Sequence, residues 1–119
     1  MSTRSGVVTP VRGEIWGVDL DPIVGREQAG RRPALVVSDD ALNSGPRGLV
    51  VVIPITGRSR GLPNHAPIAP PEGGLTKPSV IMTEQVRSVS KDRLGRRYGT
   101  VSKATMGQVE RILRIVLGL

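Results

Sequence analysis

The chain of 119 residues is long enough for one domain with a single modest core. Its 17 Lys and Arg against 10 Asp and Glu give a net charge of +7, which favours a polyanionic partner, either nucleic acid or an acidic protein. The absence of cysteine excludes disulfides and thiolate metal sites, and the single histidine, His65, excludes a multi-histidine metal cage within one chain.

The first half of the chain predicts a tail and three strands. Residues 1–11 are small and polar, typical of a flexible N-terminal tail, and residues 12–119 are expected to form one domain. Apolar positions over residues 13–20 predict a strand, and a polar loop follows it up to residue 32. Residues 33–38 and 48–55 are apolar enough to be strands buried on both faces, separated by a helical turn that Asp39-Asp40 caps.

The second half predicts shorter strands and then a helix. Residues 57–74 are rich in Gly and Pro and hold one short strand near 66–69, whereas 79–90 give two strands and 97–101 one more. Ser102 is a suitable N-cap for a helix whose apolar residues recur every three or four positions, and Gly118 is a suitable end. We expect a mainly β fold, a small bent sheet or barrel with one C-terminal helix packed on it.

Two adjacent arginines, Arg31 and Arg32, stand where the loop meets the second apolar strand, just before Pro33. Side chains at the edge of a rigid strand often bind or catalyse, and paired guanidiniums can grip the oxygens of a phosphodiester. The alternative is a solvated loop with incidental charge, which composition alone would favour.

Three blocks of sequence resemble the MazF/PemK/Kid toxin family, in order and with its spacing. The first is RGEIW, VDLDP, VG, EQAG and RPALVVS within residues 12–38; the others are VIPIT at 52–56 with LPNH at 62–65, and SVIMTEQVRSV at 79–89. The resemblance covers roughly residues 12–117.

This resemblance implies the toxin of a bacterial type II toxin–antitoxin pair. Such toxins are metal-independent endoribonucleases without a cofactor, which cut single-stranded RNA at short sequences and thereby inhibit translation and growth. Their fold is a small SH3-like β-barrel with a C-terminal helix, and they act as homodimers neutralised by the acidic C-terminal tail of a cognate antitoxin.

The resemblance also assigns site residues. The family's catalytic arginine and threonine match Arg32 and Thr56, and its RNA-site positions match Glu27, Gln28, Asn64, His65 and Gln85. Arg26 stands where the family often has serine. Further cations in the predicted loops should rim the site and bind the RNA backbone; they are Arg26, Arg31, Arg58, Arg60 and Lys77.

Metal-free cleavage most simply uses the neighbouring 2′-hydroxyl as nucleophile, which leaves a 2′,3′-cyclic phosphate and a 5′-hydroxyl. Arg32 can stabilise charge on the phosphate, but a guanidinium stays protonated and is a poor base. Glu27 and His65 are more ordinary bases, and the sequence leaves the base unassigned.

Two other functions remain open from the sequence. A non-catalytic toxin like the gyrase-binding CcdB would share the fold, although the chain ends VLGL without the aromatic residue expected there. A basic RNA-binding barrel without activity is the third possibility. No apolar run approaches the ~20 residues that span a bilayer, and no secretory signal is present, so we expect a cytoplasmic protein that does not contact a membrane.

Overall fold

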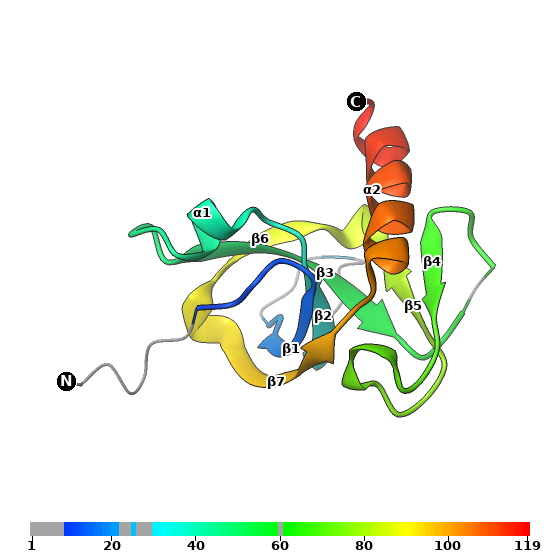
Figure 1. The fold of residues 1–119 in the computed structure, drawn as a ribbon, viewed down its shortest axis with the longest axis horizontal. Helices are drawn as coiled ribbons and strands as arrows, with labels where there is room; N and C mark the ends of the chain where they lie inside the picture. Colours follow the sequence, from blue (N-terminus) through cyan, green and yellow to red (C-terminus); the bar gives the residue numbers. More distant parts are fainter. Residues whose placement is uncertain (1–8, 22–24, 26–29, 60) are drawn as a thin grey trace.

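The computed structural model describes residues 9–21, 25, 30–59 and 61–119. Within these residues, seven strands and two α-helices follow one another, with three short 3₁₀ turns between them (Figure 1). The strands are β1 (Glu14–Asp19), β2 (Arg31–Val36), β3 (Leu49–Thr56), β4 (His65–Ile68), β5 (Ser79–Met82), β6 (Arg87–Ser90) and β7 (Leu94–Thr100). The helices are α1 (Asp40–Asn43) and α2 (Lys103–Leu117), and the turns are η1 (Glu72–Gly74), η2 (Thr83–Gln85) and η3 (Lys91–Arg93).

All strand pairs are antiparallel, in the order β4-β5-β3-β2-β1-β7, with β6 also paired to β3. The eight residues of β3 serve two neighbours on one side, because its first half pairs with β6 and its last two residues pair with β5. The predicted mainly β fold with a C-terminal helix is therefore confirmed. A ladder that would close this sheet into a barrel is not detected among the described residues.

The central strands bury both of their faces. Alternate residues contribute to two separate clusters: Ile15, Leu35 and Ile53 to one, and Trp16, Ala34 and Val52 to the other. Because successive side chains of a strand point to opposite faces, a strand that is covered on both sides must be apolar throughout. This explains the uninterrupted apolar runs in the second half of β2 and along most of β3.

Helix α2 covers the first of these clusters. The Ser102 hydroxyl accepts a hydrogen bond from the Thr105 amide at 3.1 Å, and Gly118 takes the left-handed conformation with φ of 72°, so both predicted ends are confirmed. Val109 is fully buried against the sheet. The end of α2 extends beyond the sheet (Figure 1), and Ile115 is 80% exposed there. No helix in the described part of the chain is long and apolar enough to cross a membrane.

Three strands begin earlier in the chain than predicted, and the other strand ends differ by no more than two residues. β2 begins at Arg31 instead of Pro33, because Arg31 and Arg32 pair with Asp19 and Val18 of β1. β4 begins at His65, in register with Met82 of β5, and β7 begins at Leu94, opposite Val18. In each case pairing with a neighbouring strand extends the element into polar sequence, where hydrophobic patterning gives no signal.

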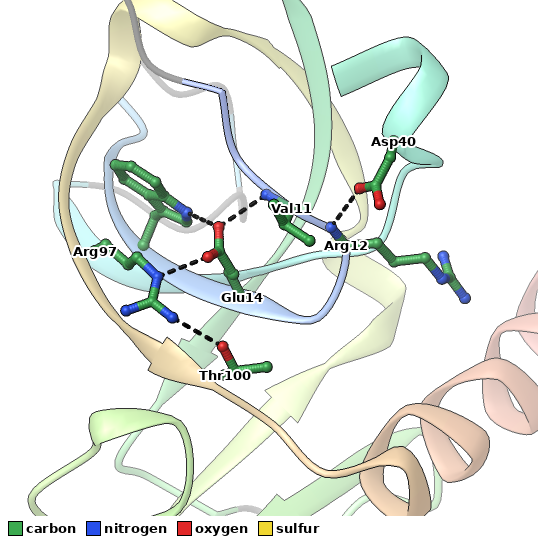
Figure 2. Close-up of polar contacts among 7 residues, drawn as sticks. Val11, Arg12, Glu14, Asp40, Arg97 and Thr100 are labelled. Carbon is green, nitrogen blue, oxygen red and sulfur yellow. Dashed lines mark hydrogen bonds and ion pairs between the residues drawn. The ribbon is translucent and has the colours of Figure 1, made fainter. Parts of the chain in front are cut away.

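Glu14 of β1 joins the start of the domain to β7 (Figure 2). One carboxylate oxygen accepts hydrogen bonds from the Val11 amide at 2.8 Å and the Trp16 indole at 3.0 Å, and the other accepts from Arg97 Nε at 2.6 Å. Burial acts to raise the pKa of Glu14, but these hydrogen bonds and the charge of Arg97 outweigh it, so the pKa lies below its ordinary 4.5.

Candidate active site

Arg32 and Thr56 come from adjacent strands and line the same cavity, of about 450 Å³. Arg32 is the second residue of β2 and is half-buried, and Thr56 is the last residue of β3. Strand pairing fixes both backbones, since Arg32 lies opposite Val18 and Thr56 lies opposite Val80. The remaining lining residues are Gly57, Arg58, His65, Lys77 and Met82.

The hydroxyl of Thr56 is oriented by the chain that follows it. Its Oγ1 accepts a hydrogen bond from the Arg58 amide at 3.2 Å. Because a hydroxyl carries one proton as well as acceptor lone pairs, Thr56 can still donate a hydrogen bond to a ligand in the cavity.

Lys77 lies directly over Gly57. A Cβ added at Gly57 would lie 3.0 Å from Lys77 Cε and 3.4 Å from Nζ, so the missing side chain of Gly57 gives the lysine its place. Three cations, Arg32, Arg58 and Lys77, thus line the cavity, and none of the described residues that line it carries a carboxylate. Such a lining favours an anion, and the oxygens of a phosphate group fit both the planar guanidinium and the ammonium group.

His65 also lines the cavity, but both of its ring nitrogens are occupied or covered. Nε2 lies 3.1 Å from Glu84 Oε2 of η2, and the side chain of His65 is only 5% exposed. Nδ1 is buried without a hydrogen-bond partner. Asn64 holds the same carboxylate, with Nδ2 donating to Glu84 Oε1 at 2.6 Å. β4 begins at His65, and its pairing with β5 holds the ring in this buried position.

A second cavity, of about 300 Å³, adjoins the first. The two share Arg32, Gly57 and Lys77, and the second is also lined by Arg31 and Tyr98. In the described ranges, no three His, Cys, Asp or Glu side chains come together as a metal site would require.

The family described as PemK-like, MazF-like toxin of type II toxin–antitoxin system matches residues 11–117. The chain belongs to this family.

Two relatives in this family align with nearly the whole length of the chain. The chain is 38% identical to endoribonuclease MazF9 of Mycobacterium tuberculosis over 113 residues, which is 91% of this chain and 96% of the relative. It is 36% identical to endoribonuclease EndoA of Bacillus subtilis over 109 residues, covering 91% and 94%. The chain is therefore a MazF-like endoribonuclease toxin, and the prediction of a ribonuclease is confirmed over the gyrase-binding alternative.

Solved structures share the fold. The crystal structure of MazF from Deinococcus radiodurans superposes with a TM-score of 0.84 at 30% identity, covering 95% of this chain and 100% of that one. A mycobacterial endoribonuclease in complex with its cognate antitoxin gives a TM-score of 0.73 at 29% identity, with 95% and 97% covered.

Within this MazF-like toxin, the predicted site residues fall into three groups. Arg32, Thr56, Arg58 and His65 line one cavity, and Arg31 lines the adjoining one. Asn64 reaches the site only through Glu84, and Gln85 lies half-buried in η2 and does not line either cavity. Arg26, Glu27 and Gln28 lie outside the described residues, as does Arg60.

Hydrogen bonds hold together the two ends of the loop that carries Arg26, Glu27 and Gln28 and attach its first end to Arg93. The Leu20 amide donates to the Gly30 carbonyl at 3.0 Å, and the Gly30 amide donates to Asp21 Oδ1 at 3.0 Å. Arg93 Nη1 donates to the Asp19 carbonyl at 3.1 Å and also to the Asp21 carbonyl. The loop therefore leaves and re-enters the sheet directly beside Arg31 and Arg32.

Sequence reasoning missed two residues of the site, Glu84 and Tyr98. Glu84 lies in the TEQ segment, within a block that resembles the family. A charged residue directly before Gln85, which was predicted as a site residue, could have pointed to it. Tyr98 offered none beyond being the chain's single tyrosine, in a segment expected only to be a strand.

Proposed function

We propose that this toxin cleaves single-stranded RNA without a metal ion, at the cavity lined by Arg32 and Thr56. The 2′-hydroxyl attacks the adjacent phosphorus, the bond to the 5′-oxygen breaks, and the products are a 2′,3′-cyclic phosphate and a 5′-hydroxyl. The observation that carries this proposal is the cavity itself, where the two side chains expected to be catalytic, Arg32 and Thr56, meet two further cations, and no carboxylate is among the described residues that line it. Mg²⁺ is usually bound through carboxylates, so this donor set suits a phosphate better than a divalent ion.

Arg32 and Thr56 act on the phosphate from two strands. The guanidinium stabilises the charge that develops on the phosphoryl oxygens, and the Thr56 hydroxyl donates a hydrogen bond to one of them. Arg58 and Lys77 add positive charge at the cavity, and these cations strengthen the binding of the RNA backbone. A fixed, cationic site of this kind lowers the barrier because its donors need no reorganisation during the reaction.

His65 is a poor candidate for the base in this arrangement. Its Nε2 is engaged by Glu84 and its Nδ1 is buried, so neither nitrogen is free to take a proton from a 2′-hydroxyl in this arrangement. Glu27 is the other base that the sequence names. Because the Arg32 guanidinium remains protonated, its role is to stabilise charge on the phosphate.

We further propose that the toxin acts in the cytoplasm as a homodimer and is neutralised by the acidic tail of a cognate antitoxin. Support for the antitoxin comes from the mycobacterial relative solved with its own antitoxin and from the net charge of +7. Support for the dimer comes from the apolar end of α2, where Ile115 is 80% and Leu119 82% exposed.

A cleavage assay in EDTA tests the proposed reaction. Purified toxin is incubated with a defined single-stranded RNA and with the same RNA carrying a 2′-deoxy nucleotide at each mapped cut, and the ends are analysed. Discrete cuts with 5′-hydroxyl ends that vanish on 2′-deoxy substitution support the proposal. Cleavage that needs a divalent ion, or that survives the 2′-deoxy substitution, overturns it. RNA that is bound but uncut, or a poisoned gyrase in a parallel assay, would point to the alternative functions.

A further inference from the structure

The chain has very few aromatic side chains with which to hold an RNA base. It has no Phe, one Trp and one Tyr. Trp16 is 8% exposed, packs in the second core cluster and donates its indole N–H to Glu14, so it is committed to the fold. Single-stranded RNA is usually recognised by stacking splayed bases on flat side chains. Tyr98 is therefore the one Phe, Trp or Tyr ring of this chain that can meet a base.

Tyr98 lies next to the proposed phosphate site. It lines the second cavity together with Arg31 and Arg32, and that cavity shares Arg32, Gly57 and Lys77 with the first. A nucleotide whose phosphate contacts Arg32 thus has a neighbouring space of about 300 Å³ with Tyr98 among its lining residues. Tyr98 and the proposed phosphate site at Arg32 therefore lie in adjoining cavities, as the base and the phosphate of one nucleotide would require.

Local backbone geometry sets the ring in this place. Along β1 and β7, Ile15 pairs with Gly99 and Trp16 with Arg97, so Tyr98 is the extra residue of a β-bulge. Bulges redirect side chains and are frequent beside active sites. Gly17 of β1 makes room for the ring, since a Cβ there would lie 3.3 Å from Tyr98 Cε1.

A second cation supports the ring from outside the cavity. Arg96 Cζ lies 4.5 Å from the centroid of the Tyr98 ring, a cation–π distance. Tyr98 lines the second cavity, whereas Arg96 is not among its lining residues. No hydrogen bond to the Tyr98 hydroxyl is found within the described part of the chain, and Tyr98 also packs at the border of the first core cluster.

We propose that Tyr98 is a specificity-determining residue: it receives the base of a nucleotide adjoining the scissile phosphate, in the cavity next to Arg32. The inference rests on the proposed function, because it takes Arg32 as the phosphate contact. The ring supplies a stacking surface, so the site prefers an unpaired, splayed base and discriminates by the fit of that base beside Arg31 and Lys77.

The test compares Tyr98→Phe, which keeps the ring, with Tyr98→Leu, which keeps the apolar packing and loses the ring. The substrate is an RNA whose cut has been mapped, with 2-aminopurine placed in turn on either side of the scissile phosphate and a 2′-deoxy sugar to prevent cleavage. Binding is followed by quenching of the 2-aminopurine, and KM and kcat are measured on the unmodified RNA. Melting temperatures of all variants are recorded.

Wild type and Tyr98→Phe should quench 2-aminopurine at one of the two positions. Tyr98→Leu should lose that quenching and raise KM about five- to hundredfold with a smaller change in kcat, the usual weight of one stacked base. If Tyr98→Leu quenches and binds like wild type, the ring has only a packing role and the inference is overturned. If Tyr98→Leu does not fold, absence of quenching at both positions by wild type and Tyr98→Phe overturns it equally. An Arg32→Ala variant with full activity would instead refute the proposed function.

Discussion

At the scale of single residues, the site depends on where each side chain leaves the backbone. Arg32 belongs to β2 and lies opposite Val18, and the next residue, Pro33, lies opposite Gly17. A guanidinium carried by a paired strand starts from a fixed point, as a preorganised phosphate site requires. Thr56 starts from an equally fixed point at the end of β3, in register with Val80.

Replacement of His65 by alanine should reduce cleavage by less than about 100-fold, the lower end of what an essential acid or base contributes. The reason is that Nε2 is held by Glu84 and Nδ1 is buried, so the ring shapes the cavity wall without exchanging a proton with RNA. The measurement is kcat/KM against pH for wild type and His65→Ala, with melting temperatures as a check on folding. Loss of activity comparable to that of Arg32→Ala, with a changed pH profile, would assign the proton transfer to His65 after all.

The sequence predicted Arg32 and Thr56 as residues of one site, because both stand in blocks that resemble the family. In the structure both line the same cavity. It did not predict the surroundings of His65, whose burial follows from the register of β4 with β5. Nor did it predict Tyr98, because a lone tyrosine acquires its position from a bulge against β1, and a bulge leaves no periodic pattern in one strand.

At the scale of elements, β1 and β7 are the last two strands at one end of the sheet. The residues that precede β1 are bonded to this end, and β7 carries Tyr98. Glu14 bonds the Val11 amide, Trp16 and Arg97, which ties the start of the domain to this edge (Figure 2). Arg12 joins the same segment to α1, since its amide donates a hydrogen bond to Asp40 Oδ1 at 2.8 Å. The RGEIW block therefore serves the structure, whereas the arginines further on serve the cavity.

Glu14→Gln should lower the free energy of unfolding at pH 7 by about 1–3 kcal/mol, because a charge-assisted network is weakened. The pKa of Glu14 is lowered in the folded protein, so its carboxylate stabilises the fold above pH 4.5 and this contribution is lost as the pH falls through the folded-state value. Urea unfolding at pH 7 and in acid measures the effect: the difference between wild type and Glu14→Gln should shrink on acidification. A difference that is constant with pH would show that the charge of Glu14 is not what matters.

Helices and strands could be predicted from the sequence wherever apolar residues form a continuous run or recur every two, three or four positions. The ends of α2 were predictable from Ser102 and Gly118, as were the buried runs of β2 and β3. The boundaries at Arg31, His65 and Leu94 were not, because the pairing partner decides them and the local sequence does not. The loop between β1 and β2 holds Arg26, Glu27 and Gln28, and their part in RNA binding stays a prediction.

At the scale of the whole molecule, charge and surface suit a polyanion. The net charge is +7, and Arg32, Arg58 and Lys77 gather at the cavity with Arg31 beside it. A field of this sign attracts RNA from a distance, and salt screens it. The same field would attract the acidic tail of an antitoxin, so substrate and inhibitor should compete in a salt-dependent manner.

Lys77→Ala should weaken RNA binding and make it less sensitive to salt. Removal of one phosphate contact lowers the slope of log K against log salt by about 0.7 for a single strand. Lys103→Ala is the matched control, because Lys103 is exposed at the start of α2 and does not line either cavity. Equal slopes for wild type and Lys77→Ala would show that Lys77 does not contact the RNA backbone.

The central claim is that Arg32 stabilises the transition state of a metal-free cleavage. The most direct measurement is the single-turnover rate of wild type, Arg32→Ala and the control Arg47→Ala on one mapped RNA in EDTA; Arg47 is exposed beyond α1 and lines neither cavity. Loss of one such donor typically costs about 100- to 1000-fold, so Arg32→Ala should be slower by at least the lower of these factors while Arg47→Ala cleaves like wild type. A folded Arg32→Ala protein that cuts the RNA at nearly the wild-type rate would contradict the claim.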